Sequence, residues 1–120
     1  MIYIRSLSFY LVYVASAVLA GLIGCFVGPF LNLRLRLKML SIWPRFSNWV
    51  LYKTCNIRIK VEGEENIPKG PFVIVSNHQG QWETFFYQYF FFPLTTLLKR
   101  ELLFIPLWGW SLALLKPIAI

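Results

Sequence analysis

The 120-residue sequence has few acidic residues, two cysteines and a single histidine, His78. The two cysteines, Cys25 and Cys55, form no CxxC pair and no cluster with histidine, so the sequence offers no ligand set for a structural zinc site. A disulfide framework is not expected either. We predict that both cysteines are reduced and serve as small apolar residues, and that no metal is bound.

Charged residues of any kind are scarce. They make up 14% of the chain, and hydrophobic residues make up 58%, whereas soluble domains have roughly 25% charged and roughly 45–50% apolar residues. The 12 basic and 5 acidic residues give a formal charge of +7. Such a charge would suit nucleic acid or an anionic membrane surface. Because the chain is so apolar, we expect a membrane partner and no nucleic acid.

No charge interrupts the stretch from Leu7 to Phe30. About 20 apolar residues cross a bilayer core as a helix, so this stretch is long enough. A cleaved signal peptide is the competing interpretation, but its apolar region is shorter, and the small residues Ala15 to Ala17 fall in the middle of this one. We predict a retained transmembrane helix whose small residues allow close packing with other helices.

The flanks of this stretch differ in charge. Arg5 is the only basic residue before it, whereas seven basic residues follow it before the first acid, Glu62. The positive-inside rule then places the downstream side in the cytoplasm. We therefore predict an inner (cytoplasmic) membrane protein with its larger part on the cytoplasmic face.

Residues 31–53 mix basic and apolar residues and include Trp43, Pro44 and Trp49. Proline in a helix interior removes a hydrogen bond, so we expect Pro44 to interrupt a continuous helix. One interpretation is one or two amphipathic helices on the lipid headgroups, with the tryptophans at the interface. The alternative is an amphipathic helix packed on the downstream domain. In either case, residues 1–53 form the membrane anchor and interfacial region.

Residues 54–120 have the pattern of an α/β domain. Period-two alternation predicts a half-exposed strand, a short apolar run predicts a buried one, and Pro93 ends an aromatic helix. The expected elements are strands at 57–61 and 72–75, a helix at 82–92, a strand at 95–98, a helical stretch at 101–115 broken around Pro106 and Gly109, and a strand at 116–120. About 65 residues are few for an independent α/β domain, so we expect the truncated first part of a longer one.

The segment from Val75 to Glu83, VSNHQGQWE, is the most informative for chemistry. Histidine titrates near neutrality and accepts a proton from a hydroxyl, best when a carboxylate holds its second nitrogen. Glu83 follows His78 by five residues, at the start of the predicted helix, so a turn between them would bring the two side chains together. The alternative is an ordinary first-turn helix acid beside a turn histidine.

Asn77 and His78, four residues and then an acid resemble the NH-x4-D block of the glycerol-phosphate and lysophosphatidic acid acyltransferases. Glu83 stands where this family most often has Asp. The resemblance covers roughly residues 57–120 and suits an N-terminal portion with a hydrophobic anchor. The further blocks that resemble bacterial 1-acylglycerol-3-phosphate acyltransferases are Lys99-Arg100-Glu101-Leu102, Ile105-Pro106, Gly109-Trp110 and Lys116-Pro117-Ile118-Ala119-Ile120.

This resemblance implies transfer of an acyl chain from acyl-CoA or acyl-carrier protein to the sn-2 hydroxyl of lysophosphatidic acid. His78 would be the general base, and Glu83 would orient it. No cofactor is implied, and the absence of a G-x-S-x-G nucleophile motif agrees with direct transfer. A non-catalytic membrane-anchored fragment or assembly protein is the alternative, but it leaves the NHQGQWE and KREL blocks unexplained.

The acceptor phosphate would need cations, and Lys99 and Arg100 are the candidates, unless they are solvated surface charges. The FPEGTR-like block that binds phosphate in the family does not occur in these residues, so part of the acceptor site is expected beyond them. The aromatic run at 85–92 either borders a groove for an acyl chain or packs inside the protein or membrane.

Overall fold

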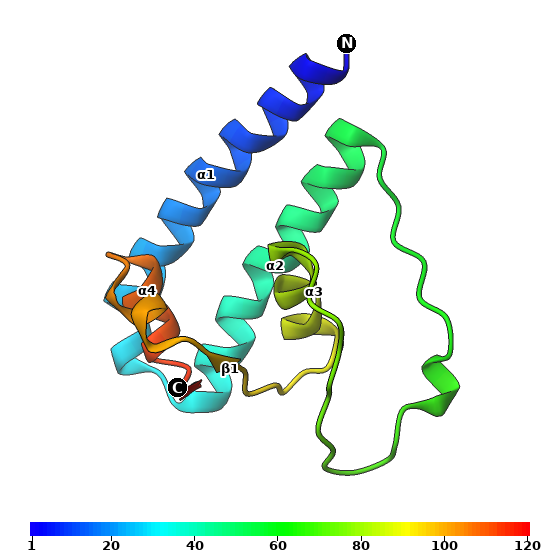
Figure 1. Cartoon of the computed structure of the whole chain (residues 1–120). Helices are drawn as coiled ribbons and strands as arrows, with labels where there is room; N and C mark the ends of the chain where they lie inside the picture. Colours follow the sequence, from blue (N-terminus) through cyan, green and yellow to red (C-terminus); the bar gives the residue numbers. More distant parts are fainter.

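A computed structural model describes all residues from 1 to 120 and contains mainly helix. Two long helices form a hairpin, a third packs beside the second, and a fourth lies near the end of the first (Figure 1). Two short strands pair near the C-terminus. The elements are α1 (Ile2–Val27), η1 (Gly28–Phe30), α2 (Leu33–Cys55), η2 (Glu64–Asn66), α3 (Gln81–Phe90), β1 (Leu97–Leu98), η3 (Arg100–Phe104), α4 (Trp108–Ala113) and β2 (Ile118–Ala119).

Helix α1 begins five residues before the predicted apolar stretch and contains all of it except the last three residues, which form η1. Together with η1 it is long and apolar enough to cross a membrane, judged by length and composition. Much of its surface is exposed, and Tyr3 and Phe26, for example, are 88% and 73% exposed. Exposed apolar surface of this extent suits contact with lipid.

Helix α2 runs without a break through Pro44, so the predicted interruption is wrong. Proline costs a helix roughly 3 kcal/mol, but Pro44 is buried, and packing of a whole helix face outweighs the loss of one backbone bond. Asn32 caps the start by accepting a hydrogen bond from the Leu35 N–H at 2.9 Å. Asn56 ends the helix in the left-handed conformation, with φ of 55°.

Trp43 was predicted at a lipid interface, but it lies between helices. Its ring contacts Tyr13 of α1 and Phe85 of α3, with centroid distances of 5.2 Å and 4.9 Å. Its indole N–H donates to the Ser16 hydroxyl at 3.1 Å. Trp49, by contrast, is 56% exposed. Thus α2 turns one tryptophan toward the protein and the other outward.

Arginine side chains fasten both ends of the hairpin. The Arg5 Nε donates to the Thr54 carbonyl at 2.7 Å and joins the start of α1 to the end of α2. At the opposite end, Arg36 donates to the carbonyls of Leu31 and Pro29, at 2.7 Å and 3.2 Å. The same guanidinium reaches the Leu114 carbonyl at 3.3 Å, which attaches the C-terminal segment to the turn.

Helix α4 packs closely on the second half of α1. A Cβ at Gly24 would stand 2.7 Å from the Ser111 Cβ, so only glycine allows this approach. The Cys25 thiol also contacts the Leu107 carbonyl, at 3.2 Å. Small residues in α1 therefore permit helix packing, and the partner helix comes from the C-terminal part of the chain.

The α/β prediction is supported only in part. Strands β1 and β2 lie inside the segments predicted at 95–98 and 116–120, and they pair in parallel with Leu97 opposite Ile118. Helix α3 matches the predicted 82–92 helix, and η3 and α4 divide the predicted 101–115 stretch. The strands predicted at 57–61 and 72–75 are absent. A strand needs a neighbouring backbone to pair with, and no segment of residues 1–120 pairs with either one.

The protein interior is small. Only Val50, Phe86 and Leu115 are buried among the large hydrophobic residues. Val73 and Val75, which were expected in a buried strand, are 89% and 93% exposed. The contacts between elements are concentrated in the helical group formed by α1, α2, α3 and α4, on which the candidate site depends.

Candidate active site

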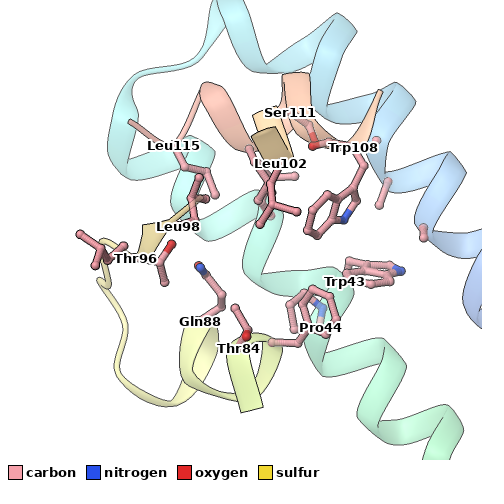
Figure 2. A pocket seen from close by; sticks show the side chains of 17 residues that line it. Trp43, Pro44, Thr84, Gln88, Thr96, Leu98, Leu102, Trp108, Ser111 and Leu115 are labelled. Carbon is pink, nitrogen blue, oxygen red and sulfur yellow. The ribbon is translucent and has the colours of Figure 1, made fainter. Parts of the chain in front are cut away.

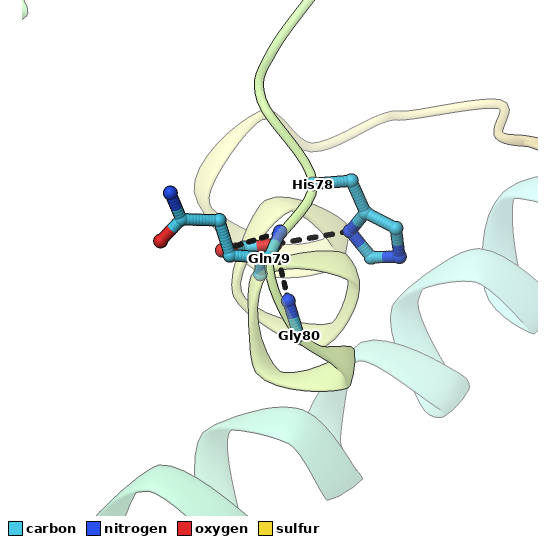
Figure 3. Close-up of polar contacts among 4 residues, drawn as sticks. His78, Gln79 and Gly80 are labelled. Carbon is cyan, nitrogen blue, oxygen red and sulfur yellow. Dashed lines mark hydrogen bonds and ion pairs between the residues drawn. The ribbon is translucent and has the colours of Figure 1, made fainter.

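The structure brings His78 and Glu83 together at the start of α3. The His78 Nδ1 lies 2.9 Å from the Glu83 Oε2, which is hydrogen-bonding distance. Figure 3 shows the imidazole and the backbone N–H groups of Gln79 and Gly80 converging on one carboxylate. The turn between the two residues therefore has the geometry that their spacing predicted.

Glu83 is the third residue of α3, and Gly80 is its N-cap. The carboxylate accepts hydrogen bonds from the N–H of Gly80 at 3.2 Å and from that of Gln79 at 3.0 Å. An acid at this position satisfies free backbone donors of the helix start. The N–H of Gly80 is the main cause that lowers the pKa of Glu83 below 4.5; Gln79 and His78 act in the same direction, and partial burial opposes them. Glu83 is therefore ionised at neutral pH.

The two side chains differ in exposure. His78 has 66% of its side-chain surface free, whereas Glu83 has 23%. When the ionised carboxylate accepts the Nδ1 proton, the lone pair remains on Nε2. This atom is then available to accept a proton from an incoming hydroxyl. An arrangement of this kind can supply a general base whose tautomer is held by an ionised carboxylate.

No hydrogen bond or ion pair joins Lys99 or Arg100 to His78 or Glu83. Lys99 precedes η3 and Arg100 is its first residue. Both side chains are exposed and form no hydrogen bond or ion pair within the chain. In the backbone, the Arg100 N–H donates to the Ile120 carbonyl at 2.9 Å, and the Lys99 carbonyl accepts from the Leu102 N–H at 3.0 Å. Their role in binding phosphate stays a prediction. No group of three His, Cys, Asp or Glu side chains is placed to hold a metal ion.

Sequence reasoning missed the residues that hold this site in place. The backbone donors of Gln79 and Gly80 could have been anticipated, because an acid at the third helical position commonly bonds back to the helix start. Asn48 of α2 gave no such signal. Its amide oxygen accepts from the Trp82 indole N–H, and its amide nitrogen donates to the Tyr89 hydroxyl at 2.8 Å.

An apolar cavity of about 100 Å³ lies between α1, α2, α3 and α4. In Figure 2, Thr84 and Gln88 of α3 line it together with Trp43 and Trp108. Ligand pockets usually measure roughly 300–1,000 Å³, so this cavity is too small for an acyl chain. Phe85, from the aromatic run, lines it as packing. Phe86 of the same run is buried.

Comparison with known proteins agrees with the family resemblance of the sequence. A family model described as acyltransferase matches residues 58–120, which is more than half of the chain. A curated 1-acyl-sn-glycerol-3-phosphate acyltransferase of Pseudomonas aeruginosa is 50% identical over 118 residues, which cover 98% of this chain and 46% of that protein. A Saccharomyces cerevisiae protein of the same name is 39% identical over 57 residues, which cover 47% of this chain and 19% of that protein.

The chain thus spans less than half the length of either relative. No solved structure matches it. The family model and the Pseudomonas relative both include the segment that carries His78 and Glu83. The chain belongs to the acyltransferase family.

Proposed function

We propose that this chain carries the catalytic pair of a 1-acyl-sn-glycerol-3-phosphate acyltransferase. The observation that carries the proposal is the 2.9 Å contact between His78 Nδ1 and Glu83, which leaves Nε2 free on an exposed imidazole. The names of the two relatives support the substrate: an acyl chain passes to lysophosphatidic acid and gives phosphatidic acid. The donor is the thioester of acyl-CoA or of acyl-carrier protein, and no cofactor takes part.

In the proposed mechanism, His78 Nε2 takes the proton of the sn-2 hydroxyl while that oxygen attacks the thioester carbonyl. A C–O bond forms, the C–S bond breaks, and the proton on His78 passes to the departing thiolate. Glu83 keeps the Nδ1 proton in place and stabilises the imidazolium that forms during the reaction. General-base catalysis of this kind contributes roughly 10²–10⁴-fold.

We further propose that residues 54–120 are the first part of an α/β acyltransferase domain, in which β1 and β2 begin a parallel sheet. Residues 1–53 form the membrane region. The domain then works on the cytoplasmic face of the inner membrane, with the exposed apolar side of α1 in lipid. We propose that Lys99 and Arg100 bind the acceptor phosphate, because cationic side chains form strong charge-assisted hydrogen bonds with phosphate.

The test is His78→Ala in the full-length protein that contains these residues. Membranes are assayed for phosphatidic acid formed from lysophosphatidic acid, with acyl-CoA and acyl-carrier protein supplied separately. We expect activity to disappear while the variant still reaches the membrane in normal amount. Glu65→Gln is the control, because this exposed acid forms no hydrogen bond or ion pair in the chain. Near-normal activity of His78→Ala would overturn the proposal.

A further inference from the structure

A single amide on α2 holds both ends of the helix that carries Glu83. Asn48 accepts a hydrogen bond from the indole N–H of Trp82, the second residue of α3. It also donates to the hydroxyl of Tyr89, near the end of α3, at 2.8 Å. Asparagine has a donor and an acceptor on one short side chain, so it satisfies both partners at once.

The Trp82 bond acts directly beside Glu83. Trp82 stacks on the buried Phe86 ring, with centroids 5.0 Å apart and planes 22° from parallel. The indole N–H of the same ring is bonded to Asn48 of α2. The first turn of α3 is therefore held on one side by Phe86, in the next turn of α3, and on the other by α2. Glu83 is the next residue along that turn and moves with it.

His78 depends on this turn for its position. No backbone–backbone hydrogen bond involves residues 68–79, so the segment that carries the histidine has no ladder of its own. The only hydrogen bond of the His78 side chain is the one to Glu83. The position of the imidazole therefore follows Glu83, and that of Glu83 follows the first turn of α3. Asn48 fixes this first turn of α3 through its hydrogen bond with Trp82.

We infer that Asn48 is a positioning residue for the His78–Glu83 pair, an inference that rests on the proposed function. It touches neither imidazole nor carboxylate and acts through Trp82. Loss of its bond lets the helix start shift and moves the base relative to the acceptor hydroxyl. A misplacement of about 1 Å can cost roughly 10²-fold in rate. Substrate binding elsewhere is unaffected, so the loss falls on kcat and not on KM.

Four variants of the full-length protein test this inference. Asn48→Leu removes both bonds, Trp82→Phe removes one and keeps the ring that stacks on Phe86, and Tyr89→Phe removes the other. Asn48→Asp is the conservative variant, because a carboxylate accepts from both the indole N–H and the tyrosine O–H. We expect Asn48→Leu and Trp82→Phe to lower kcat by roughly ten- to a hundredfold with little change in KM. Tyr89→Phe and Asn48→Asp should stay within about threefold of the unchanged protein, as expected for a bond far from the pair or one that is replaced.

A purely structural role gives a different pattern, which a double variant reveals. If Trp82 acts through Glu83, Trp82→Phe in a Glu83→Gln background should cause no further loss of kcat, because effects within one unit are not additive. A structural role predicts additive losses that follow the thermal midpoint. Wild-type kcat in both Trp82→Phe and Asn48→Leu, with His78→Ala inactive, overturns the inference and leaves the proposed function standing. Activity of His78→Ala overturns the proposed function itself.

Discussion

Replacing Glu83 with glutamine tests the chemistry of the pair most directly. Glutamine has nearly the same size, and its amide oxygen can still accept the N–H of Gln79 or Gly80, at the present 3.0 Å and 3.2 Å. Its NH₂ group, however, donates to His78 Nδ1 where the carboxylate accepts. The imidazole is then held with its proton on Nε2, which is the atom that must accept the proton of the hydroxyl.

The expected loss in kcat is roughly 10²–10⁴-fold, the full contribution of a general base, with KM changed little. Glu83→Asp is the matched variant: it keeps the charge, shortens the side chain by one methylene, and has the acid that is common in the family. We expect it to retain most of the activity. Initial rates of phosphatidic acid formation, measured over a range of lysophosphatidic acid concentrations, give both constants. If Glu83→Gln kept a kcat close to that of the unchanged protein, the orienting role of the carboxylate would be refuted.

Two further predictions concern stability. Because the pKa of Glu83 is lowered on folding, its stabilising effect is complete above about pH 4.5 and is lost as the pH falls through the lower folded value. The thermal midpoint of Glu83→Gln in detergent should therefore lie below that of the unchanged protein at pH 6 and approach it below pH 4.5. A difference that stays constant with pH would contradict this prediction. At Gly109 an added Cβ would stand 2.7 Å from the Leu103 carbonyl oxygen, so Gly109→Ala should destabilise by about 1–3 kcal/mol. Gly80→Ala, with no atom within 4 Å of the added Cβ, should leave the midpoint nearly unchanged, and equal midpoints for the two variants would show that the close packing at Gly109 is wrong.

Local features of the sequence predicted local structure well. The absence of charge from Leu7 to Phe30 predicted α1, and Pro93 predicted the end of the aromatic helix α3. The geometry of His78 and Glu83 was also predictable, because five residues and one helix start determine it. Each of these features depends on neighbours within a few residues along the chain.

Features that depend on distant partners were not predictable in the same way. Pro44 stays inside α2 because the helix packs on α1 along its length. The segment at 72–75 has a strand-like composition but no neighbour to pair with in residues 1–120. Asn48 meets Trp82 across 34 positions of sequence, and nothing in the local pattern of α2 indicates that contact.

The hydrogen bond at the open end of the hairpin restricts how α1 can lie in a membrane, because Arg5 Nε is 2.7 Å from the Thr54 carbonyl. If α1 crossed the bilayer alone, these two groups would lie on opposite faces, about 30 Å apart. Crossing back by α2 would restore the contact but is unfavourable, since a basic side chain costs roughly 2.5–3.5 kcal/mol at the bilayer centre and α2 has five along its length. Those side chains are Arg34, Arg36, Lys38, Arg45 and Lys53. We therefore expect residues 3 and 60 to lie on one face while the Arg5–Thr54 bond is formed.

Single cysteines test this, placed at Tyr3 or at Lys60 in a background in which Cys25 and Cys55 are replaced by alanine. If the hairpin is intact and faces the cytoplasm, as proposed, a membrane-impermeant maleimide should label neither position in intact cells and both after permeabilisation. Labelling of the cysteine at position 3 alone in intact cells would mean that α1 crosses the membrane, as the charge of its flanks predicted. The Arg5–Thr54 bond would then be open in the bilayer, and α1 would contact the rest of the chain only near its C-terminal end, at the turn that Arg36 fastens and at α4.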